Sequence, residues 1–91
     1  MFTLVPTEYF LRRARRFLRK HPDLRQRFAQ VLDDLKLDPF APHLVYHHLG
    51  GKLKDAQAVS MTYHDRIILR IEVTDQEIIL LDIGSHDEVY R

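Results

Sequence analysis

The chain has 91 residues, of which 45% are hydrophobic, and its 14 basic and 13 acidic side chains leave a net charge of +1. Length and apolar content predict one domain over residues 1–91, built around one core, and exclude intrinsic disorder. The absence of cysteine excludes a disulfide framework, a thiolate metal site and a cysteine nucleophile.

The sequence carries no signal for export or membrane insertion. Met1–Pro6 is too short and too uncharged for a signal peptide, and no apolar run approaches the roughly 20 residues that cross a membrane. We therefore expect a cytoplasmic protein with no membrane contact, which agrees with the lack of cysteine.

Positive charge is concentrated early in the chain. Residues 1–36 carry nine basic and four acidic side chains, whereas residues 37–91 carry five basic and nine acidic ones. Six of the basic residues fall within nine positions, namely Arg12, Arg13, Arg15, Arg16, Arg19 and Lys20. This density suits contacts with phosphates or with an acidic protein, and it equally suits a solvated helix face.

The first half predicts a short strand and two helices. Residues 1–5 alternate weakly and end at a proline, and Thr7 is placed to cap a helix over residues 7–20. Apolar side chains recur there at helical spacing, which predicts one buried stripe with the arginines facing outward. A second helix follows His21-Pro22-Asp23 and runs to Lys36, and Asp38-Pro39 ends it. Two amphipathic helices with so short a link predict a helical hairpin.

From residue 56 the apolar period changes to two, which predicts strands over 56–63, 66–73 and 77–83. The links between them are short enough for antiparallel hairpins. In the middle strand Arg66 and Arg70 share one face. Residues 37–55 read as a long ordered loop. The order β-α-α-β-β-β predicts an α+β domain with the helical hairpin packed on an antiparallel sheet.

Three segments carry a family resemblance. Together with the length and the order of elements, they are similar to the RelE/ParE superfamily of type II toxin–antitoxin toxins, and most similar to the YafQ-like and RelE-like mRNA interferases. The segments are His48-Leu49-Gly50-Gly51-Lys52-Leu53-Lys54, Asp65-Arg66-Ile67-Ile68-Leu69-Arg70 and Ile83-Gly84-Ser85-His86-Asp87-Glu88-Val89-Tyr90. The resemblance implies a RelE-like fold.

The resemblance also implies a function and partners. The expected activity is a metal-independent endoribonuclease without a cofactor, which cleaves mRNA on the ribosome and is held in check by a cognate antitoxin in a hetero-oligomer. In this reaction the ribose 2′-hydroxyl attacks the neighbouring phosphate. It needs a base for the 2′ proton, an acid for the departing 5′ oxygen, and cations that stabilise the transition state.

The resemblance implies a role for each of several side chains. His86 is expected to be the acid, and His48 or Asp65 the base. The histidines suit proton transfer because imidazole titrates near neutral pH. Arg66, Lys52 and Lys54 are the expected cations, since a guanidinium grips a phosphate through two parallel hydrogen bonds. The expected RNA-binding residues are Tyr90, which offers a ring to a base, and Arg70, Arg12, Arg13 and Arg16, which offer charge to the backbone.

Ordinary structural roles remain open for all of them. His86 can close a strand end, Arg66 and Arg70 can form ion pairs, and Tyr90 can plug the edge of the core. Asp65 can belong to a hairpin turn, and lysines in a glycine turn are usually solvated. A metal site of His47, His48, His64 and His86 is not expected, because no spacing brings them together.

Two other functions fit the same pattern. A ParE-like toxin that inhibits DNA gyrase shares the fold and performs no nuclease chemistry, so its histidines would be dispensable. An inactive, stabilising partner of the module is the third possibility, because a net charge of +1 is low for a protein that docks on ribosomal RNA.

Overall fold

The computed structural model of the chain describes residues 1–90. The helices and strands are β1 Thr3–Pro6, α1 Glu8–Lys20, α2 Arg25–Leu37, β2 His47–His48, β3 Gln57–Ser60, β4 Asp65–Glu72, β5 Glu77–Ser85 and α3 His86–Val89. Single 3₁₀ turns cover Pro22–Leu24, Pro42–Leu44 and Gly51–Leu53. The predicted order of elements is confirmed, with β2 and α3 added.

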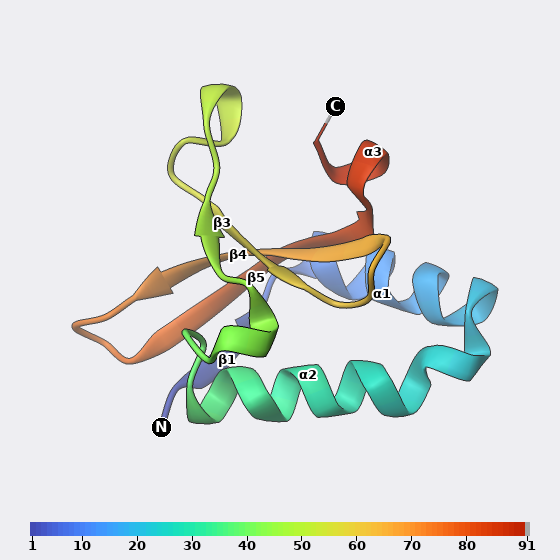
Figure 1. Cartoon of the computed structure of the whole chain (residues 1–91), viewed down its shortest axis with the longest axis horizontal. Helices are drawn as coiled ribbons and strands as arrows, with labels where there is room; N and C mark the ends of the chain where they lie inside the picture. Colours follow the sequence, from blue (N-terminus) through green and yellow to red (C-terminus); the bar gives the residue numbers. More distant parts are fainter. Residues whose placement is uncertain (91) are drawn as a thin grey trace.

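One five-stranded sheet in the order β1-β5-β4-β3-β2 forms the middle of the molecule. Helices α1 and α2 lie on one side of it, while α3 and the segment between β2 and β3 stand up from the other side (Figure 1). The predicted α+β architecture, with a helical hairpin packed on a sheet, is therefore confirmed.

The sheet departs from the prediction in three places. It is mixed, because β1 runs parallel to β5 at one edge while the other neighbours are antiparallel. Strand β3 ends at Ser60, since the chain turns at Met61 to reach β4. The segment 37–55, expected to be a loop, contains β2 and two 3₁₀ turns.

The two long helices form for the reasons seen in the sequence. The Thr7 hydroxyl accepts the Phe10 N–H at 3.0 Å and so caps α1, as predicted. Phe10 and Phe28 stack at 6.4 Å between ring centroids, which joins α1 to α2. Helix α2 begins later than predicted, because Pro22–Leu24 forms a separate turn.

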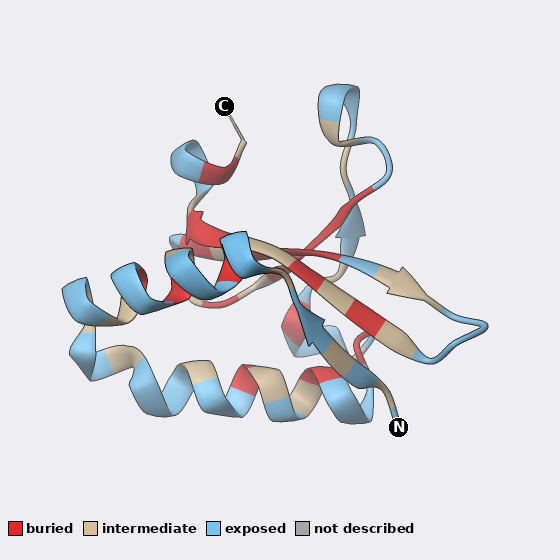
Figure 2. Cartoon of the chain, turned by 180° about the vertical axis from the view of Figure 1, so that it is seen from behind, coloured by how far each residue is buried: buried red, intermediate tan, exposed pale blue. Residues whose placement is uncertain are grey.

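Apolar side chains pack on both faces of the sheet. The main core fills the space between the sheet and the helices, and the inward helix faces are buried while the outward faces are exposed (Figure 2). A smaller cluster lies on the opposite face and consists of Ala56, Ala58, Ile68 and Val89, with Leu49, Leu81 and Tyr90 partly buried against it. In residues 1–90 no helix has the length and apolar content of a membrane span.

The main core makes a direct prediction about stability. Leu35 is completely buried, so Leu35→Ala should lower the free energy of unfolding by about 2 to 5 kcal/mol through lost burial and a cavity. Leu37, on the same helix, is 68% exposed, and Leu37→Ala should cost less than about 0.5 kcal/mol. Urea unfolding of both variants measures the difference; equal losses would contradict this description of the core.

Candidate functional site

The second face of the sheet carries an open hollow. It encloses about 690 Å³ and is lined by His47, His48, Leu49, Gly50, Arg66, His86 and Tyr90. Of the side chains expected to act on RNA, His48, Arg66, His86 and Tyr90 therefore lie around one space. They come from β2, β4, α3 and the residue that follows α3.

The pairing of β4 with β5 places Arg66 next to the start of α3. Arg66 is paired with Gly84 and Asp65 with Ser85, so the chain that continues into His86 leaves the sheet beside Arg66. Since β4 and β5 are long strands paired with each other, this part of the site is built on a rigid element.

The turn between β3 and β4 holds the side chain of Arg66 and the backbone of His86. Nη1 of Arg66 donates to the carbonyl oxygens of Thr62 at 3.0 Å, Tyr63 at 3.3 Å and Asp65 at 3.0 Å. The N–H of His86 donates to the carbonyl of His64 at 3.1 Å. A side chain of α2 anchors this turn: Nε of Arg27 donates to the carbonyl oxygen of Met61 at 3.0 Å.

His86 and Tyr90 form one wall of the hollow. They lie four residues apart at the two ends of α3, and their rings meet edge to face at 4.3 Å between centroids. Burial raises the pKa of the Tyr90 phenol, and neighbouring Arg66 lowers it in part. Among residues 1–90 no group forms a hydrogen bond with the buried Tyr90 hydroxyl.

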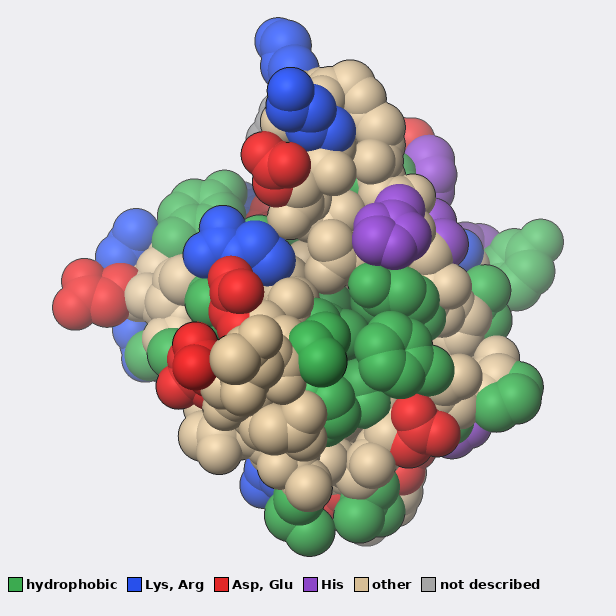
Figure 3. Space-filling model, turned by 90° about the vertical axis from the view of Figure 1, so that its left-hand side faces the viewer, with side chains coloured by type: hydrophobic (Ala, Val, Ile, Leu, Met, Phe, Trp, Pro, Cys, Tyr) green, Lys and Arg blue, Asp and Glu red, His purple; other side chains and the backbone are tan. Residues whose placement is uncertain are grey.

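His48 borders the hollow from β2 at the edge of the sheet, but its pairing with Gln57, and through Gln57 with Leu69 of the main core, directs its ring toward the helix side of the sheet. Its ring packs edge to face on Tyr46 at 5.6 Å, and Tyr46 packs in the same way on exposed Phe40 at 4.9 Å. Figure 3 shows histidine side chains bordering an apolar area on this side of the molecule. Nδ1 of the adjacent His47 lies 2.9 Å from the Val45 carbonyl oxygen, so His47 is tied to its own loop.

Other predicted site residues lie elsewhere. Asp65 is only 8% exposed, and its carboxylate accepts the Thr62 hydroxyl at 2.7 Å inside the turn. Arg70 forms an exposed ion pair with Glu72 at 3.1 Å. Lys52 lines an adjoining hollow with Leu49, Gly50, Gly51, Leu53 and Tyr90, whereas Lys54 belongs to neither lining.

The prediction that the arginines of α1 all face outward is wrong for Arg13. Nε of Arg13 lies 2.8 Å from Oδ1 of Asp82 on β5, and the Arg13 side chain is only 16% exposed. A Cβ on Gly84 would lie 2.9 Å from Nη2 of Arg13, so the guanidinium covers this glycine. Arg12 and Arg16 are exposed, as predicted.

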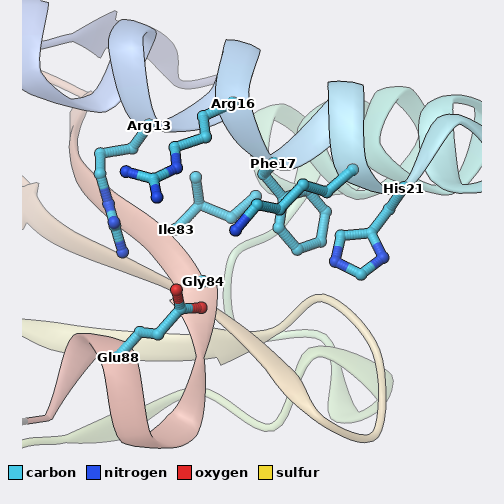
Figure 4. Close-up of a pocket in the computed structure, with 8 residues that line it drawn as sticks. Arg13, Arg16, Phe17, His21, Ile83, Gly84 and Glu88 are labelled. Atoms are coloured by element: carbon cyan, nitrogen blue, oxygen red, sulfur yellow. The ribbon is translucent and has the colours of Figure 1, made fainter.

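Arg13 also lies close enough to α3 for its charge to act on Glu88. Figure 4 shows Arg13 and Arg16 reaching from α1 toward Glu88 of α3 across a small hollow. Hydrogen bonds from Ser85 lower the pKa of Glu88, and the charges of Arg13 and Lys20 lower it further. Ser85 and Glu88 form a capping box, in which each side chain accepts the backbone N–H of the other. The sequence prediction missed α3, although this Ser-x-x-Glu pattern signals it.

No protein-family model and no curated protein sequence matches the chain. Solved structures match it over nearly its whole length. A copper-bound mutant toxin from Helicobacter pylori is 25% identical, with 99% of this chain and 100% of that chain covered at a TM-score of 0.80. YafQ from Escherichia coli is 12% identical over 100% of both chains at a TM-score of 0.83.

A YoeB/ParE toxin from Agrobacterium tumefaciens is 19% identical over 94% of this chain and 99% of that chain, at a TM-score of 0.76. YafQ also matches in its complex with DinJ, at a TM-score of 0.73, 12% identity and full coverage of both chains. The chain therefore has the fold of the RelE/YafQ-like toxins, and the resemblance found in the sequence is confirmed in its fold.

Residues 1–90 of this chain offer no cluster of side chains that fits a metal centre. The Helicobacter pylori toxin that is 24% identical over 99% of this chain is metal-bound. Among residues 1–90 here, no group of three or more His, Cys, Asp or Glu side chains is arranged to hold a metal ion. A structural metal site usually needs four such ligands and a catalytic one three.

The capping box makes a prediction about pH. Because the pKa of Glu88 is lowered in the folded protein, its carboxylate contributes stability above its unfolded pKa, and this contribution is lost as the pH falls through the lowered value. Ser85→Ala removes the hydroxyl that accepts the Glu88 N–H and interacts with the carboxylate, while the larger cause of the lowered pKa, the hydrogen bond from the backbone N–H of residue 85, remains. The Glu88 pKa should therefore rise but stay below its ordinary value, and the free energy of unfolding should fall by about 1 kcal/mol.

NMR titration of the Glu88 carboxyl measures this shift. Ser60→Ala, on the half-buried end of β3, is the matched hydroxyl control and should leave the Glu88 pKa unchanged. Unchanged stability together with an unchanged Glu88 pKa in Ser85→Ala would contradict the part of the capping box that the Ser85 hydroxyl makes.

Proposed function

We propose that this protein is the toxin of a type II toxin–antitoxin module and cuts mRNA as a metal-independent endoribonuclease. The observation that carries the proposal is the single hollow that His48, Arg66, His86 and Tyr90 line from four separate segments. The structural likeness to YafQ and to the YoeB/ParE toxin supports the toxin role.

The hollow offers the groups that cleavage by a 2′-hydroxyl needs. We assign His48 as the base that takes the 2′ proton after its ring has turned from Tyr46 into the hollow, while the 2′ oxygen forms a bond to phosphorus. As the bond between phosphorus and the 5′ oxygen breaks, His86 gives that oxygen a proton. The positive charge of the Arg66 guanidinium stabilises the negative charge on the phosphoryl oxygens. Hydrogen bonds from its Nη1 to three carbonyl oxygens hold the group in place before the RNA binds.

His48 is a better base than Asp65 on two grounds. His48 is exposed and lines the same hollow as His86. The Asp65 carboxylate is buried and is hydrogen-bonded within its own turn. We assign no contact with RNA to Arg70 or Lys54, since neither lines the hollow.

Substrate and partners follow from the same proposal. The substrate is mRNA on the ribosome, which places the protein in the cytoplasm, and exposed Arg12 and Arg16 on α1 supply charge for RNA phosphates. We assign no phosphate contact to Arg13, because its ion pair with Asp82 neutralises its charge. A cognate antitoxin is the proposed protein partner, as the complex of YafQ with DinJ suggests.

The acid assignment predicts a large effect of one substitution. His86→Ala should lower the cleavage rate by about 10² to 10⁴ and leave folding nearly unchanged, because the side chain is 64% exposed. His43→Ala is the matched control, since His43 lies on the other side of the molecule in an ion pair with Asp34, and it should retain full activity.

Primer extension on mRNA from cells that express each variant without an antitoxin provides the measurement. Full cleavage of mRNA by the His86→Ala variant would contradict the assignment of His86 as the acid. Growth arrest with intact mRNA and with damaged or relaxed DNA would select the gyrase-inhibiting function. Absence of any growth arrest would favour the inactive partner.

A second prediction concerns the basic face of α1. Reversing Arg12 and Arg16 to Glu should weaken ribosome binding by at least about tenfold near physiological salt, and should make the remaining binding less dependent on salt. Arg25→Glu with Lys36→Glu makes the same charge change on exposed positions of α2 and should have a smaller effect. Sedimentation with ribosomes at two salt concentrations checks this; equal effects of both pairs would argue against a role for α1.

A further inference from the structure

The ion pair between Arg13 and Asp82 lies beside the point where the chain leaves the sheet for α3. Oδ1 of Asp82 accepts hydrogen bonds from Nε of Arg13 at 2.8 Å and from the backbone N–H of Ile83 at 2.7 Å. The side chains of the pair are only 16% and 18% exposed. Because Asp82 is itself bonded to the backbone of β5, the pair fixes the direction of the Arg13 guanidinium relative to that strand.

Gly84 leaves room for this guanidinium. A Cβ on Gly84 would lie 2.9 Å from Nη2 of Arg13 and 3.1 Å from Oε1 of Glu88, so both charged groups lie over this residue. Gly84 belongs to the extended strand β5 and has no positive φ, so its backbone conformation does not require a glycine. What the glycine supplies is therefore space, and Figure 4 shows Arg13 and Glu88 approaching it from α1 and α3.

The groups over Gly84 act on the start of α3. Oε1 of Glu88 accepts the backbone N–H of Ser85, which directly precedes His86, at 2.9 Å. Hydrogen bonds from Ser85 lower the pKa of Glu88 most, and the charge of Arg13 lowers it further. The carboxylate that caps α3 is therefore held both by the backbone at the start of the helix and by a charge that comes from α1.

We infer that Arg13 is a positioning residue for His86, the proposed acid. It makes no contact with RNA in this role. Its guanidinium, fixed by Asp82, occupies the space over Gly84 and so sets the direction in which the chain enters α3 and the place of the His86 ring in the hollow. This inference rests on the proposed function, because it concerns the acid of that reaction. An acid must lie within hydrogen-bond reach of the oxygen that it protonates, and a displacement of about 1 Å can lower a rate about 100-fold.

The first test measures cleavage of mRNA on purified ribosomes. Arg13→Ala should lower kcat by about 10- to 100-fold and change KM by less than about twofold, because the placement of the acid is lost while the contacts with RNA remain. Arg15→Ala removes an exposed arginine of the same helix and should leave both quantities unchanged. A raised KM at unchanged kcat in Arg13→Ala would overturn the inference, since Arg13 would then be an RNA-binding residue.

The second test shows whether Arg13 acts through His86. In a His86→Ala background, Arg13→Ala should cause no further loss of kcat, because the group that Arg13 positions is already gone. Equal losses of kcat in the presence and in the absence of the His86 imidazole would refute the inference.

A third variant keeps both charges of the ion pair, because removing one partner of a largely buried pair can also impair folding. The methyl group of Gly84→Ala would meet the ends of two flexible side chains, which can move aside. Gly84→Ala should lower kcat about as much as Arg13→Ala, and the two substitutions together should lower it no further. Full activity of Gly84→Ala, or a further loss in the combined variant, would contradict a role of Arg13 through this space.

Hydrogen exchange provides a readout that needs no cleavage. The N–H of His86 donates to the carbonyl oxygen of His64 at 3.1 Å, so its exchange with solvent reports how firmly the start of α3 is held. This exchange should be at least about tenfold faster in Arg13→Ala and Gly84→Ala, and unchanged in Arg15→Ala. Equal exchange in all variants would overturn the inference. Intact mRNA with the unsubstituted protein would instead show failure of the proposed function, and the exchange rates would still show whether Arg13 positions His86.

Discussion

The antiparallel pairing of β4 with β5 is the interaction on which the rest of the structure depends. It runs from Asp65 opposite Ser85 to Glu72 opposite Glu77, and both strands lie inside the sheet. One end of the pair forms the tight turn at 73–76, and the other end delivers Arg66 and the start of α3 to the same place. The candidate site is therefore attached to the most firmly paired part of the chain.

Packing on both faces of the sheet explains how so small a domain presents a site. Alternate residues of β4 face opposite sides, so Ile67 and Leu69 enter the main core while Ile68 enters the smaller cluster. That cluster includes Val89 and holds α3 against the sheet. On the other side of α3, the charge of Arg13, whose guanidinium pairs with Asp82, attracts Glu88 without an ion pair between them. His86 is thus presented on a short helix that is held from two directions.

The Tyr90 hydroxyl is the exception, because it has no hydrogen-bond partner among residues 1–90. A buried polar group without a partner costs about 1 to 3 kcal/mol, and such a group in a native structure is a sign of function or of an unseen ligand. Tyr90 lines both of the adjoining hollows on this face of the sheet.

The long helices and the three main strands were predictable from the sequence, because their apolar periods of 3.6 and 2 extend over many residues. Strand β2 and helix α3 show no period, since they have two and four residues, and α3 was signalled only by the capping-box pattern of Ser85 and Glu88. The partner of Arg13 was hidden for another reason. Helical spacing shows which side of α1 is apolar, but it does not show that Asp82, 69 residues later, meets one arginine at the border of that side.

The candidate site was predicted only in part. His48, Arg66, His86 and Tyr90 were selected through the family resemblance, and their separation along the chain gave no sign that they line one hollow. For Asp65 the resemblance and the geometry point in different directions, because local hydrogen bonds to Thr62 bury its carboxylate. The adjoining hollow could not be predicted, since it depends on how the segment 49–53 lies beside Tyr90.

The central claim is that His48, His86 and Arg66 promote attack by a ribose 2′-hydroxyl, and the ends of the cut RNA test it most directly. Purified protein is added to ribosomes that hold an mRNA, and the cleavage products are analysed by mass spectrometry. The account predicts a 2′,3′-cyclic phosphate on the upstream fragment, a 5′-hydroxyl on the downstream fragment, and no cleavage when the ribose at the cut site lacks its 2′-hydroxyl. A 5′-phosphate on the downstream fragment, or cleavage of the 2′-deoxy substrate, would contradict it.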